Sequence, residues 1–499
     1  MRTWKLANLP TPVWITLAAV GFLALQYPLR NYFVDDAYIH LTFARSIAAG
    51  EGFCFNPGEP TYGVTAPLWT LLLAVVGLGF GVTPTSAKCL SVLFGVLTIP
   101  AMHRLARKLG LSVTGAVSVT LIWAIEVWAV RWAASGMETS LALLLLLLAF
   151  SAQLTQSPIA GMYLGLAALC RPETAPLVVV FALDSARAAG WKRGLTVLLI
   201  AVVVLLPWLL YAAFSFGSII PNPAQVKGLG LPPLTDFISG LKRVVAIIGG
   251  AHFVEVTVIC AGIIWALKKR LAVDSENARR AGLLLVWAIF LPIVLLAQDV
   301  FISSRYLVIG LPPLTLGAFL ILGYWMRGKI TVGALKYGKL ITVIIIALQL
   351  TLTGLVTIPH ARSFGSTMAA LQELADYLKK NTSPNVSVAV ADVGVIGYSS
   401  GRRVIDLEGL VTPAMISHRT RGDYDSLIAT NYFLKVERPD YLIDRSRTPE
   451  RFGKQSGGLY LPLLTIPVKG GRVDTGNEVW YYTLYAVADS AGKPKGLIK

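Results

Sequence analysis

Charged residues are scarce in this chain of 499 residues: Asp, Glu, Lys and Arg together make up 14%, against about 25% in soluble globular proteins. Hydrophobic residues reach 55%, above the roughly 45–50% of soluble chains. So few polar side chains cannot cover the surface of a water-soluble fold. The composition therefore excludes a soluble enzyme, a fibrous repeat and a disordered scaffold, and indicates a membrane protein with many spanning helices.

Acidic residues are the rarer charge, with 27 Asp and Glu against 44 Lys and Arg. Because the basic excess falls in short loops, it indicates membrane orientation and not nucleic-acid binding. The four cysteines are scattered and show neither a metal-ligand spacing nor a disulfide framework. The chain contains no P-loop or HExxH motif and no convincing internal repeat. These absences remove the chemistries that such motifs would support.

Apolar runs of spanning length predict about eleven transmembrane helices. They cover residues 11–29, 86–106, 112–130, 137–153, 157–170, 172–186, 194–214, 246–267, 281–298, 306–326 and 338–358. This threading puts seventeen basic residues on one face, which the positive-inside rule makes cytoplasmic. The run at residues 67–80 is too short to span and is predicted to be a juxtamembrane helix. The N-terminus is then cytoplasmic and residues 359–499 are extracytoplasmic.

The last 141 residues hold 14 of the 27 acids and have a different pattern. A helical periodicity at residues 364–380 is followed by short β-rich runs and a second helical pattern at 425–434. The β-rich runs are residues 386–390, 403–407, 440–443 and 479–486. We therefore expect two domains, a membrane domain at 1–358 with its first outer loop at 30–85, and an extracytoplasmic α/β domain at 359–499.

Two adjacent carboxylates, Asp35 and Asp36, directly follow the first predicted span. Such a pair at a membrane surface is costly, because each raises the pKa of the other and both lose solvation. The cost suits a site where one acid removes a proton from a hydroxyl and the other holds an acceptor or a cation. The alternative is a helix N-terminus, where acids favour the macrodipole. His40, one turn later, is a further candidate substrate contact.

Basic residues also fall on the outer face, where a lipid phosphate would lie. Arg171, Lys227 and Arg305 are candidate phosphate ligands, because guanidinium and ammonium groups pair with phosphate oxygens. The alternative is that these side chains snorkel at helix ends without a ligand. Arg131 belongs to the same group on weaker grounds. The neighbouring Glu138, Glu173 and Tyr306 are candidate substrate contacts.

Three other acids have structural readings that compete with functional ones. Glu126 and Glu255 fall within predicted spans. Their functional interpretation is a proton relay, and their structural interpretation is helix-packing hydrogen bonds. Asp392-Val-Gly394 follows a predicted strand, but Asp392 occupies the first glycine position of a GxGxxG motif. A strand–turn–helix packing motif is therefore the better interpretation there.

Taken together, these stretches resemble the GT-C superfamily of integral-membrane glycosyltransferases. The likeness lies in Asp35-Asp36-Ala37-Tyr38-Ile39-His40, Phe55-Asn56-Pro57-Gly58-Glu59, Ser135-Gly136-Met137-Glu138, Arg171-Pro172-Glu173, Pro221-Asn222, Asp392-Val393-Gly394 and Asp406-Leu407-Glu408-Gly409. It is most similar to bacterial members near the cell-wall arabinofuranosyltransferases, with aminoarabinose and protein mannosyl transferases more distant. The resemblance implies a polyprenyl-phosphate sugar donor and an outer-loop Asp as general base, which aligns best with Asp35.

The resemblance predicts a glycosyltransferase of the cytoplasmic membrane whose acceptor is an extracytoplasmic glycan, lipid or protein. No cofactor is expected, although a divalent metal at Asp35 and Asp36 stays open, as in superfamily members that use pyrophosphate donors. The alternative from another class is a transporter or flippase for a lipid-linked or polar substrate, which often shows inverted repeats. A third is a binding scaffold that acts through residues 359–499.

Overall fold

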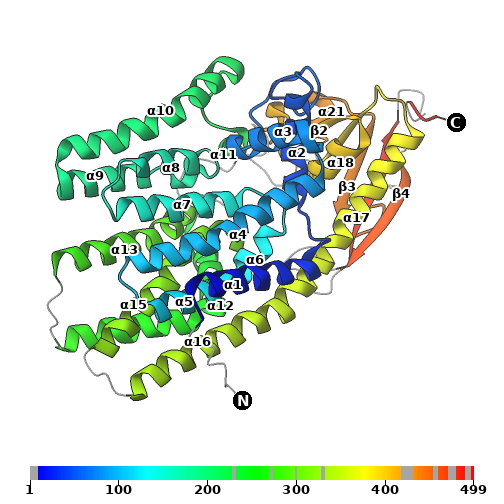
Figure 1. Ribbon diagram of the computed structural model, residues 1–499. Coiled ribbons are helices and arrows are strands. Elements are labelled where there is room, and N and C mark those ends of the chain that lie inside the picture. Colours follow the sequence, from blue (N-terminus) through cyan, green and yellow to red (C-terminus); the bar gives the residue numbers. More distant parts are fainter. Residues whose placement is uncertain are drawn as a thin grey trace.

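The computed structural model describes residues 9–226, 232–269, 274–297, 301–327, 332–416, 431–452, 459–469, 479–488 and 496–498. A bundle of helices carries an α/β region at one end (Figure 1). The first helices are α1 (Thr11–Gln26), α2 (Asp35–Ala48), α3 (Pro67–Phe80), α4 (Pro84–Lys108), α5 (Val113–Ala124), α6 (Val127–Ala133), α7 (Thr139–Gln153), α8 (Ile159–Ala168) and α9 (Leu177–Ala189). The next are α10 (Trp191–Phe216), α11 (Asn222–Val226), α12 (Leu234–Lys269), α13 (Ser275–Leu296), α14 (Ser304–Leu307), α15 (Pro312–Arg327), α16 (Val332–Leu352) and α17 (Ile358–Asn381).

Among the described residues, seven helices are long and apolar enough to cross a membrane, or eight if the bent pair α5–α6 is one span. The predicted helical membrane fold is therefore confirmed, whereas its count of eleven spans is not. The three further predicted spans fall on α7, α8 and α9, which have 15, 10 and 13 residues. Crossing about 30 Å of hydrocarbon takes about 20 residues in a straight helix. The short α3 packs against α2 at the α/β end of the bundle (Figure 1).

The ends of the long helices follow from local sequence. At α4, the Thr83 hydroxyl accepts the backbone N–H of Ser86, whose own hydroxyl accepts the N–H of Thr83. This capping box satisfies backbone donors that a helix start leaves unpaired. At the end of α10, Gly217 adopts a left-handed conformation with φ of +67°, which favours glycine. The start of α4 and the end of α10 both lie at the face of the bundle that carries the α/β region.

A buried polar cluster holds the break between α5 and α6, where the chain bends by 51°. Glu126 caps α6 by accepting the N–H of Ala129, and its other oxygen lies 3.3 Å from His252 Nε2. His252, in a non-helical turn of α12, also lies 3.2 Å from Glu255. The Gln349 side-chain oxygen accepts the N–H of Val127. These contacts match the helix-packing interpretation, because Glu126 contacts His252 of α12 and Glu255 accepts the Thr315 hydroxyl of α15 at 3.5 Å.

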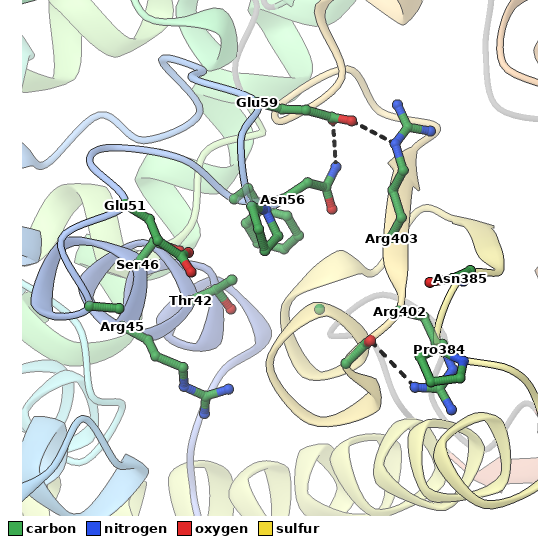
Figure 2. A pocket seen from close by; sticks show the side chains of 15 residues that line it. Thr42, Arg45, Ser46, Glu51, Asn56, Glu59, Pro384, Asn385, Arg402 and Arg403 are labelled. Carbon is green, nitrogen blue, oxygen red and sulfur yellow. Dashed lines mark hydrogen bonds and ion pairs between the residues drawn. The ribbon is translucent and has the colours of Figure 1, made fainter.

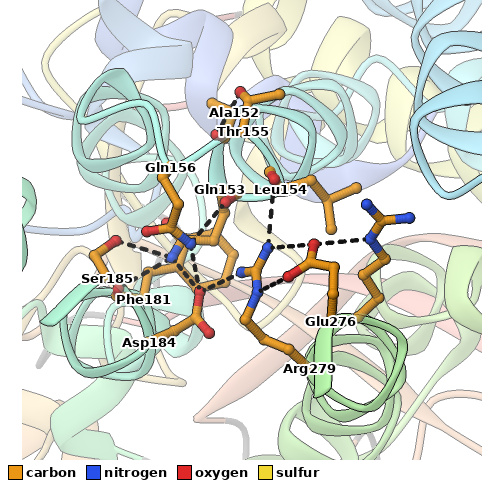
Figure 3. Close-up of polar contacts among 11 residues, drawn as sticks. Ala152, Gln153, Leu154, Thr155, Gln156, Phe181, Asp184, Ser185, Glu276 and Arg279 are labelled. Atoms are coloured by element: carbon orange, nitrogen blue, oxygen red, sulfur yellow. Dashed lines mark hydrogen bonds and ion pairs between the residues drawn. The ribbon is translucent and has the colours of Figure 1, made fainter. Parts of the chain in front are cut away.

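Charged side chains gather at the end of the bundle opposite the α/β region. There Arg279 of α13 is ion-paired with Asp184 of α9 at 2.8 Å and with Glu276 at 2.9 Å (Figure 3). Gln153 donates to the same Asp184 carboxylate at 2.6 Å, which joins the end of α7 to α9. The network binds three helix ends together. Basic side chains at this end also come from α4, α9, α10, α12 and α13: Arg104, Arg107, Lys108, Arg187, Lys192, Arg193, Lys268, Lys269 and Arg280.

The α/β region contains a five-stranded sheet in the order β2-β1-β3-β5-β4. Its described elements after α17 are β1 (Ser387–Val390), α18 (Val393–Ser400), β2 (Arg403–Asp406), α21 (Tyr432–Val436), β3 (Tyr441–Ser446), β4 (Tyr460–Lys469) and β5 (Val479–Val487). β1 is parallel to β2 and β3, and β5 is antiparallel to β3 and β4. Four strands were predicted, but β4 was missed. Most of the predicted helix at 425–434 lies outside the described residues.

Helix α17 enters the α/β region directly from the bundle, since α16, the π-helix η5 (Thr353–Thr357) and α17 follow one another without a loop. Its apolar side chains share one core with the sheet and with aromatic residues of the first outer loop, including Phe43, Phe53 and Phe55. The Asn56 side chain bonds both backbone groups of Val404 at 2.9 Å. The outer loop and the α/β region are therefore packed as one body.

The start of α18 lies against the start of α2 so closely that only glycine fits at position 394. A Cβ on Gly394 would overlap the backbone oxygen of Asp35. We expect Gly394→Ala to destabilise the protein by about 1–3 kcal/mol, because overpacked contacts must separate. Thermal unfolding in detergent and protease sensitivity of the α/β region measure this. Gly365→Ala in α17, whose Cβ would meet no heavy atom within 4 Å, is the control and should leave both unchanged or improved. Equal behaviour of the two variants would contradict the tight docking.

Candidate active site

The two carboxylates of the first turn of α2 point to different partners. Both oxygens of Asp35 accept backbone N–H groups at the start of α18, from Gly394 at 2.8 Å and Val395 at 2.9 Å. A helix N-terminus is a natural place for a carboxylate, because its N–H groups lack helical partners. The sequence motif that failed as a phosphate turn thus binds an anion of the same chain. Burial and the nearby Asp392 raise the pKa of Asp35 to about 7, against the effect of the two N–H donors.

Asp36 turns away from α18 and pairs with Arg305 of α14. Its side chain remains 47% exposed, so solvent and substrate can reach it, whereas that of Arg305 is 17% exposed. Arg305 also donates to the Tyr306 hydroxyl at 3.0 Å. The Tyr306 ring lies 5.0 Å from the Arg305 guanidinium and 5.2 Å from that of Arg171. Tyr306 therefore joins the two predicted phosphate ligands.

Arg171 is almost completely buried and is committed to acids of the protein. It forms an ion pair of 2.8 Å with Glu138 and a longer one of 3.5 Å with Glu173. It also donates to the Thr139 hydroxyl at 3.0 Å. The side chains of Arg171 and Glu138 are each 4% exposed. A buried pair of this kind is stable only while both charges are present.

His40 completes the cluster from the second turn of α2. Its Nδ1 lies 2.8 Å from the Thr70 hydroxyl, which also lies 3.2 Å from the Ala66 carbonyl. The Nε2 atom of His40 faces Glu138 at 3.8 Å. Burial lowers the pKa of His40 although Glu138 and Asp36 oppose this, so the ring is neutral at neutral pH.

The structure brings together Asp36, His40, Arg171, Arg305 and Tyr306 of the predicted residues, with Glu138 and Glu173 beside Arg171. Asp35 is next to this cluster but bonds to α18. Lys227 lies outside the described residues. Thr70 and Thr139 belong to the site and were missed, because a lone Thr in an apolar run carries no signal of its partner.

A divalent metal at Asp35 and Asp36 does not fit this arrangement. The Asp35 oxygens accept two N–H groups and Asp36 pairs with a guanidinium, so the two carboxylates do not converge on one point. Across the described residues no group of three His, Cys, Asp or Glu could hold a metal ion. We therefore assign no step to a metal.

A cavity of about 530 Å³ lies elsewhere on α2, between its later turns, the first outer loop and the α/β region (Figure 2). Among its charged side chains, Arg403 bonds Glu59 at 2.7 Å, Arg402 donates to the Thr382 carbonyl at 2.7 Å, and Arg45 donates to the Tyr398 carbonyl at 3.0 Å. Asp36 and Arg305 do not line it. This cavity is polar but is separate from the carboxylate–arginine cluster.

Comparison with known sequences gives two matches. Residues 362–485 match a family described as "Domain of unknown function (DUF8728)". The chain is 28% identical over 244 residues to the terminal beta-(1->2)-arabinofuranosyltransferase of Mycobacterium tuberculosis. That match covers 43% of this chain and 38% of the relative, so it spans less than two-fifths of the relative's length.

Solved structures match over nearly the whole chain. ArnT from Cupriavidus metallidurans in the apo state has a TM-score of 0.60 at 14% identity, covering 95% of this chain and 98% of ArnT. The same protein bound to undecaprenyl phosphate has a TM-score of 0.57 at 13% identity, covering 97% and 99%. The Archaeoglobus fulgidus oligosaccharyltransferase tethered with an acceptor peptide has 0.54 at 14%, covering 87% and 69%. The predicted resemblance is confirmed: the chain has the fold of GT-C glycosyltransferases and is an integral membrane protein.

The raised pKa of Asp35 predicts a specific dependence of stability on pH. The pKa is about 7 in the folded chain and about 4 in an unfolded one. Between these values the folded state binds the proton more tightly, so the Asp35 contribution to stability falls as pH rises from about 4 to 7. The melting temperature of Asp35→Asn minus that of the wild type should therefore rise from pH 5 to pH 8. Asp376→Asn, at an exposed acid of α17, is the control, and a flat difference for Asp35→Asn would contradict the assignment.

Removing the charge of Arg171 should damage the fold first. Arg171→Gln leaves Glu138 buried without its cation, which costs about 3–5 kcal/mol for a broken buried pair. The double variant Arg171→Gln/Glu138→Gln should recover part of this loss, since no uncompensated charge remains. Chemical or thermal unfolding in detergent measures the difference, with exposed Arg362→Gln as the control. A single variant as stable as the wild type would show that the pair is not structural.

Proposed function

We propose that this protein is a membrane glycosyltransferase that moves a sugar from a polyprenyl-phosphate donor to a hydroxyl of an extracytoplasmic glycan, lipid or protein. The fold and the similarity to an arabinofuranosyltransferase support this class of reaction. The ArnT structure with undecaprenyl phosphate supports a lipid phosphate as part of the donor. One observation carries the proposal for this chain: an accessible carboxylate, Asp36, meets a half-buried arginine, Arg305, at the end of the bundle that bears the α/β region.

Asp36 is the base in this proposal, and Arg305 binds the phosphate of the donor. Without a donor, the two charges neutralise each other. A donor phosphate competes for Arg305 through charge-assisted hydrogen bonds, which frees Asp36 beside the sugar. Asp35 is less suited, because both its oxygens are bonded at the domain contact.

The transfer balances with these groups alone. The acceptor oxygen forms a bond to the anomeric carbon while the bond from that carbon to the phosphate oxygen breaks. The bonding electrons leave with polyprenyl phosphate, and Arg305 stabilises the developing charge. The acceptor proton passes to Asp36. The buried pair of Arg171 and Glu138 positions Tyr306, which in turn contacts Arg305.

The same proposal includes an orientation. The basic end of the bundle is cytoplasmic by the positive-inside rule, which places Asp36 and the α/β region on the extracytoplasmic side. The short helices α7, α8 and α9 then complete eleven crossings. They pack against long neighbours, α7 against α4, and α8 and α9 against α10.

We expect Asp36→Asn to lower turnover by about 10²–10⁴-fold, the usual contribution of a general base. Binding of the lipid donor should change little. The assay incubates purified protein with a panel of polyprenyl-phosphate sugars and scores release of polyprenyl phosphate. Asp35→Asn is the matched control, which should alter stability and its pH dependence while keeping turnover within about tenfold.

Two outcomes would contradict parts of this scheme. If Asp35→Asn abolishes turnover and Asp36→Asn does not, the base is Asp35. If the wild type releases no polyprenyl phosphate from any donor but carries lipid-linked sugar across a vesicle membrane, the protein is a transporter.

A further inference from the structure

Arg131 of α6 is a buried cation whose counter-ion is missing from the described part of the chain. Arg131 is 6% exposed. Other arginines withdrawn from solvent in the bundle, Arg171, Arg279 and Arg305, each pair with a carboxylate of the protein. For Arg131 the described residues supply no such carboxylate. An uncompensated charge in a membrane protein is costly, so an anion from outside the described residues is expected there.

Aromatic side chains contact the Arg131 guanidinium and accept the hydrogen of its Nε. Its Nε donates to the Tyr32 hydroxyl at 3.2 Å. Its central carbon lies 5.5 Å from the Tyr32 ring and 5.2 Å from the Trp132 ring. The two terminal nitrogens donate to no described protein group. This leaves a planar fork of N–H donors in a fixed position, the geometry that matches two oxygens of a phosphate.

A neighbouring element, η5, carries further buried polar groups without a partner among the described residues. The Thr353 and Thr357 hydroxyls of η5 are buried and have no hydrogen-bond partner among the described residues, and η5 packs against α6. The spacing puts Thr353 and Thr357 on the helix face of His360 and Phe364. Phe364 contacts the Tyr32 ring, and the His360 ring interacts electrostatically with Arg131. A π-helix is uncommon and often marks a functional site.

Helix α1 supplies the other side of this seam. Gln26 donates to the Val130 carbonyl at 3.2 Å, while its side-chain oxygen is buried and has no partner among the described residues. Both flanking elements present apolar side chains outward, with Val20 of α1 57% exposed and Leu355 of η5 74% exposed. α1 and the α16–α17 helix run along the same edge of the bundle (Figure 1). The polar seam therefore lies between two elements whose outer faces are apolar.

We propose that Arg131, with Tyr32 and the Thr353 and Thr357 hydroxyls, binds the phosphate of a membrane lipid at the seam of α1, α6 and η5. The site is separate from Asp36 and Arg305 and does not depend on the proposed transfer reaction. The two are linked, because the Trp132 indole under Arg131 donates to the Ser304 hydroxyl at 2.9 Å, next to Arg305. The lipid is a phospholipid or a polyprenyl phosphate, which share this headgroup chemistry.

Native mass spectrometry of the purified full-length protein, titrated with lipid in detergent, tests this site. The probes are phosphatidylglycerol, undecaprenyl phosphate and, as the uncharged reference, diacylglycerol. We expect Arg131→Gln to weaken binding of the phosphate lipids at least about tenfold, because a charge-assisted bond is worth more than one factor of ten. Binding of diacylglycerol should not change. A preference for phosphatidylglycerol or for undecaprenyl phosphate identifies the source of the phosphate.

Variants separate this site from the proposed donor site. Arg30→Gln, at an exposed arginine after α1, is the control and should bind lipid like the wild type. Arg305→Gln should lose one molecule of undecaprenyl phosphate, and Arg131→Gln should lose one molecule of whichever phosphate lipid its site prefers. If Arg131→Gln binds both phosphate lipids like the wild type while Arg305→Gln loses a molecule, the Arg131 site is refuted and the donor site stands. A loss in Arg131→Gln alone refutes the donor site.

Two controls cover misfolding and an internal counter-ion. If Arg131→Gln does not fold, Arg131→Lys keeps the charge and removes the fork, and binding should still weaken severalfold. Asp299, outside the described residues, is an acid of this chain that could neutralise Arg131. If Asp299→Asn destabilises the protein and the wild-type melting temperature does not rise with phosphate lipid, Arg131 has an internal partner and the proposal is overturned.

Discussion

The first turn of α2 places two adjacent carboxylates about 100° apart around one helix, and their separation organises the outer end of the protein. One side chain faces the start of α18 and the other faces α14, so no single cation can serve both. Asp35 joins the first outer loop to the α/β region through backbone N–H groups. Asp36 joins the same loop to the bundle through Arg305. If this turn moved, both contacts would be lost together.

The buried charges beyond this turn explain why the cluster is rigid. Arg171 is saturated by Glu138, Glu173 and Thr139, and its guanidinium lies against the Tyr306 ring. A group committed to so many partners is poorly suited to follow a substrate, but it is well suited to hold a neighbour in place. Arg305, by contrast, has an accessible partner in Asp36, which the donor phosphate replaces in the proposed reaction. Arg171 and Arg305 therefore differ because of their burial and partners, although both are arginines.

Arg131 is also a buried arginine of the bundle, but no carboxylate among the described residues pairs with it. Its aromatic neighbours fix the guanidinium, and the hydroxyls of Thr353 and Thr357 are buried without partners among the described residues. Sequence reasoning ranked Arg131 below Arg171 as a ligand for phosphate. In the structure Arg171 is already paired with Glu138 and Glu173, whereas Arg131 has no carboxylate partner among the described residues. Counting charges at helix ends cannot reveal such a difference, since pairing depends on residues far away in sequence.

Length and composition alone determined that this is a helical membrane protein, and the apolar runs located most of its helices, because hydrocarbon thickness sets the length of a span. Strands β1, β2, β3 and β5 were also visible, whereas the alternation in β4 is interrupted by Pro462 and Pro467 and gave no signal. The acidic pair pointed to the region in which Arg305 and Arg171 also lie in the structure. Only the tertiary structure decided that Asp36 and not Asp35 is free of the domain contact, and that Arg171 is paired with Glu138. Ion pairs across 269 residues, such as Asp36 with Arg305, depend on how helices pack, and packing geometry leaves no periodic trace in the chain.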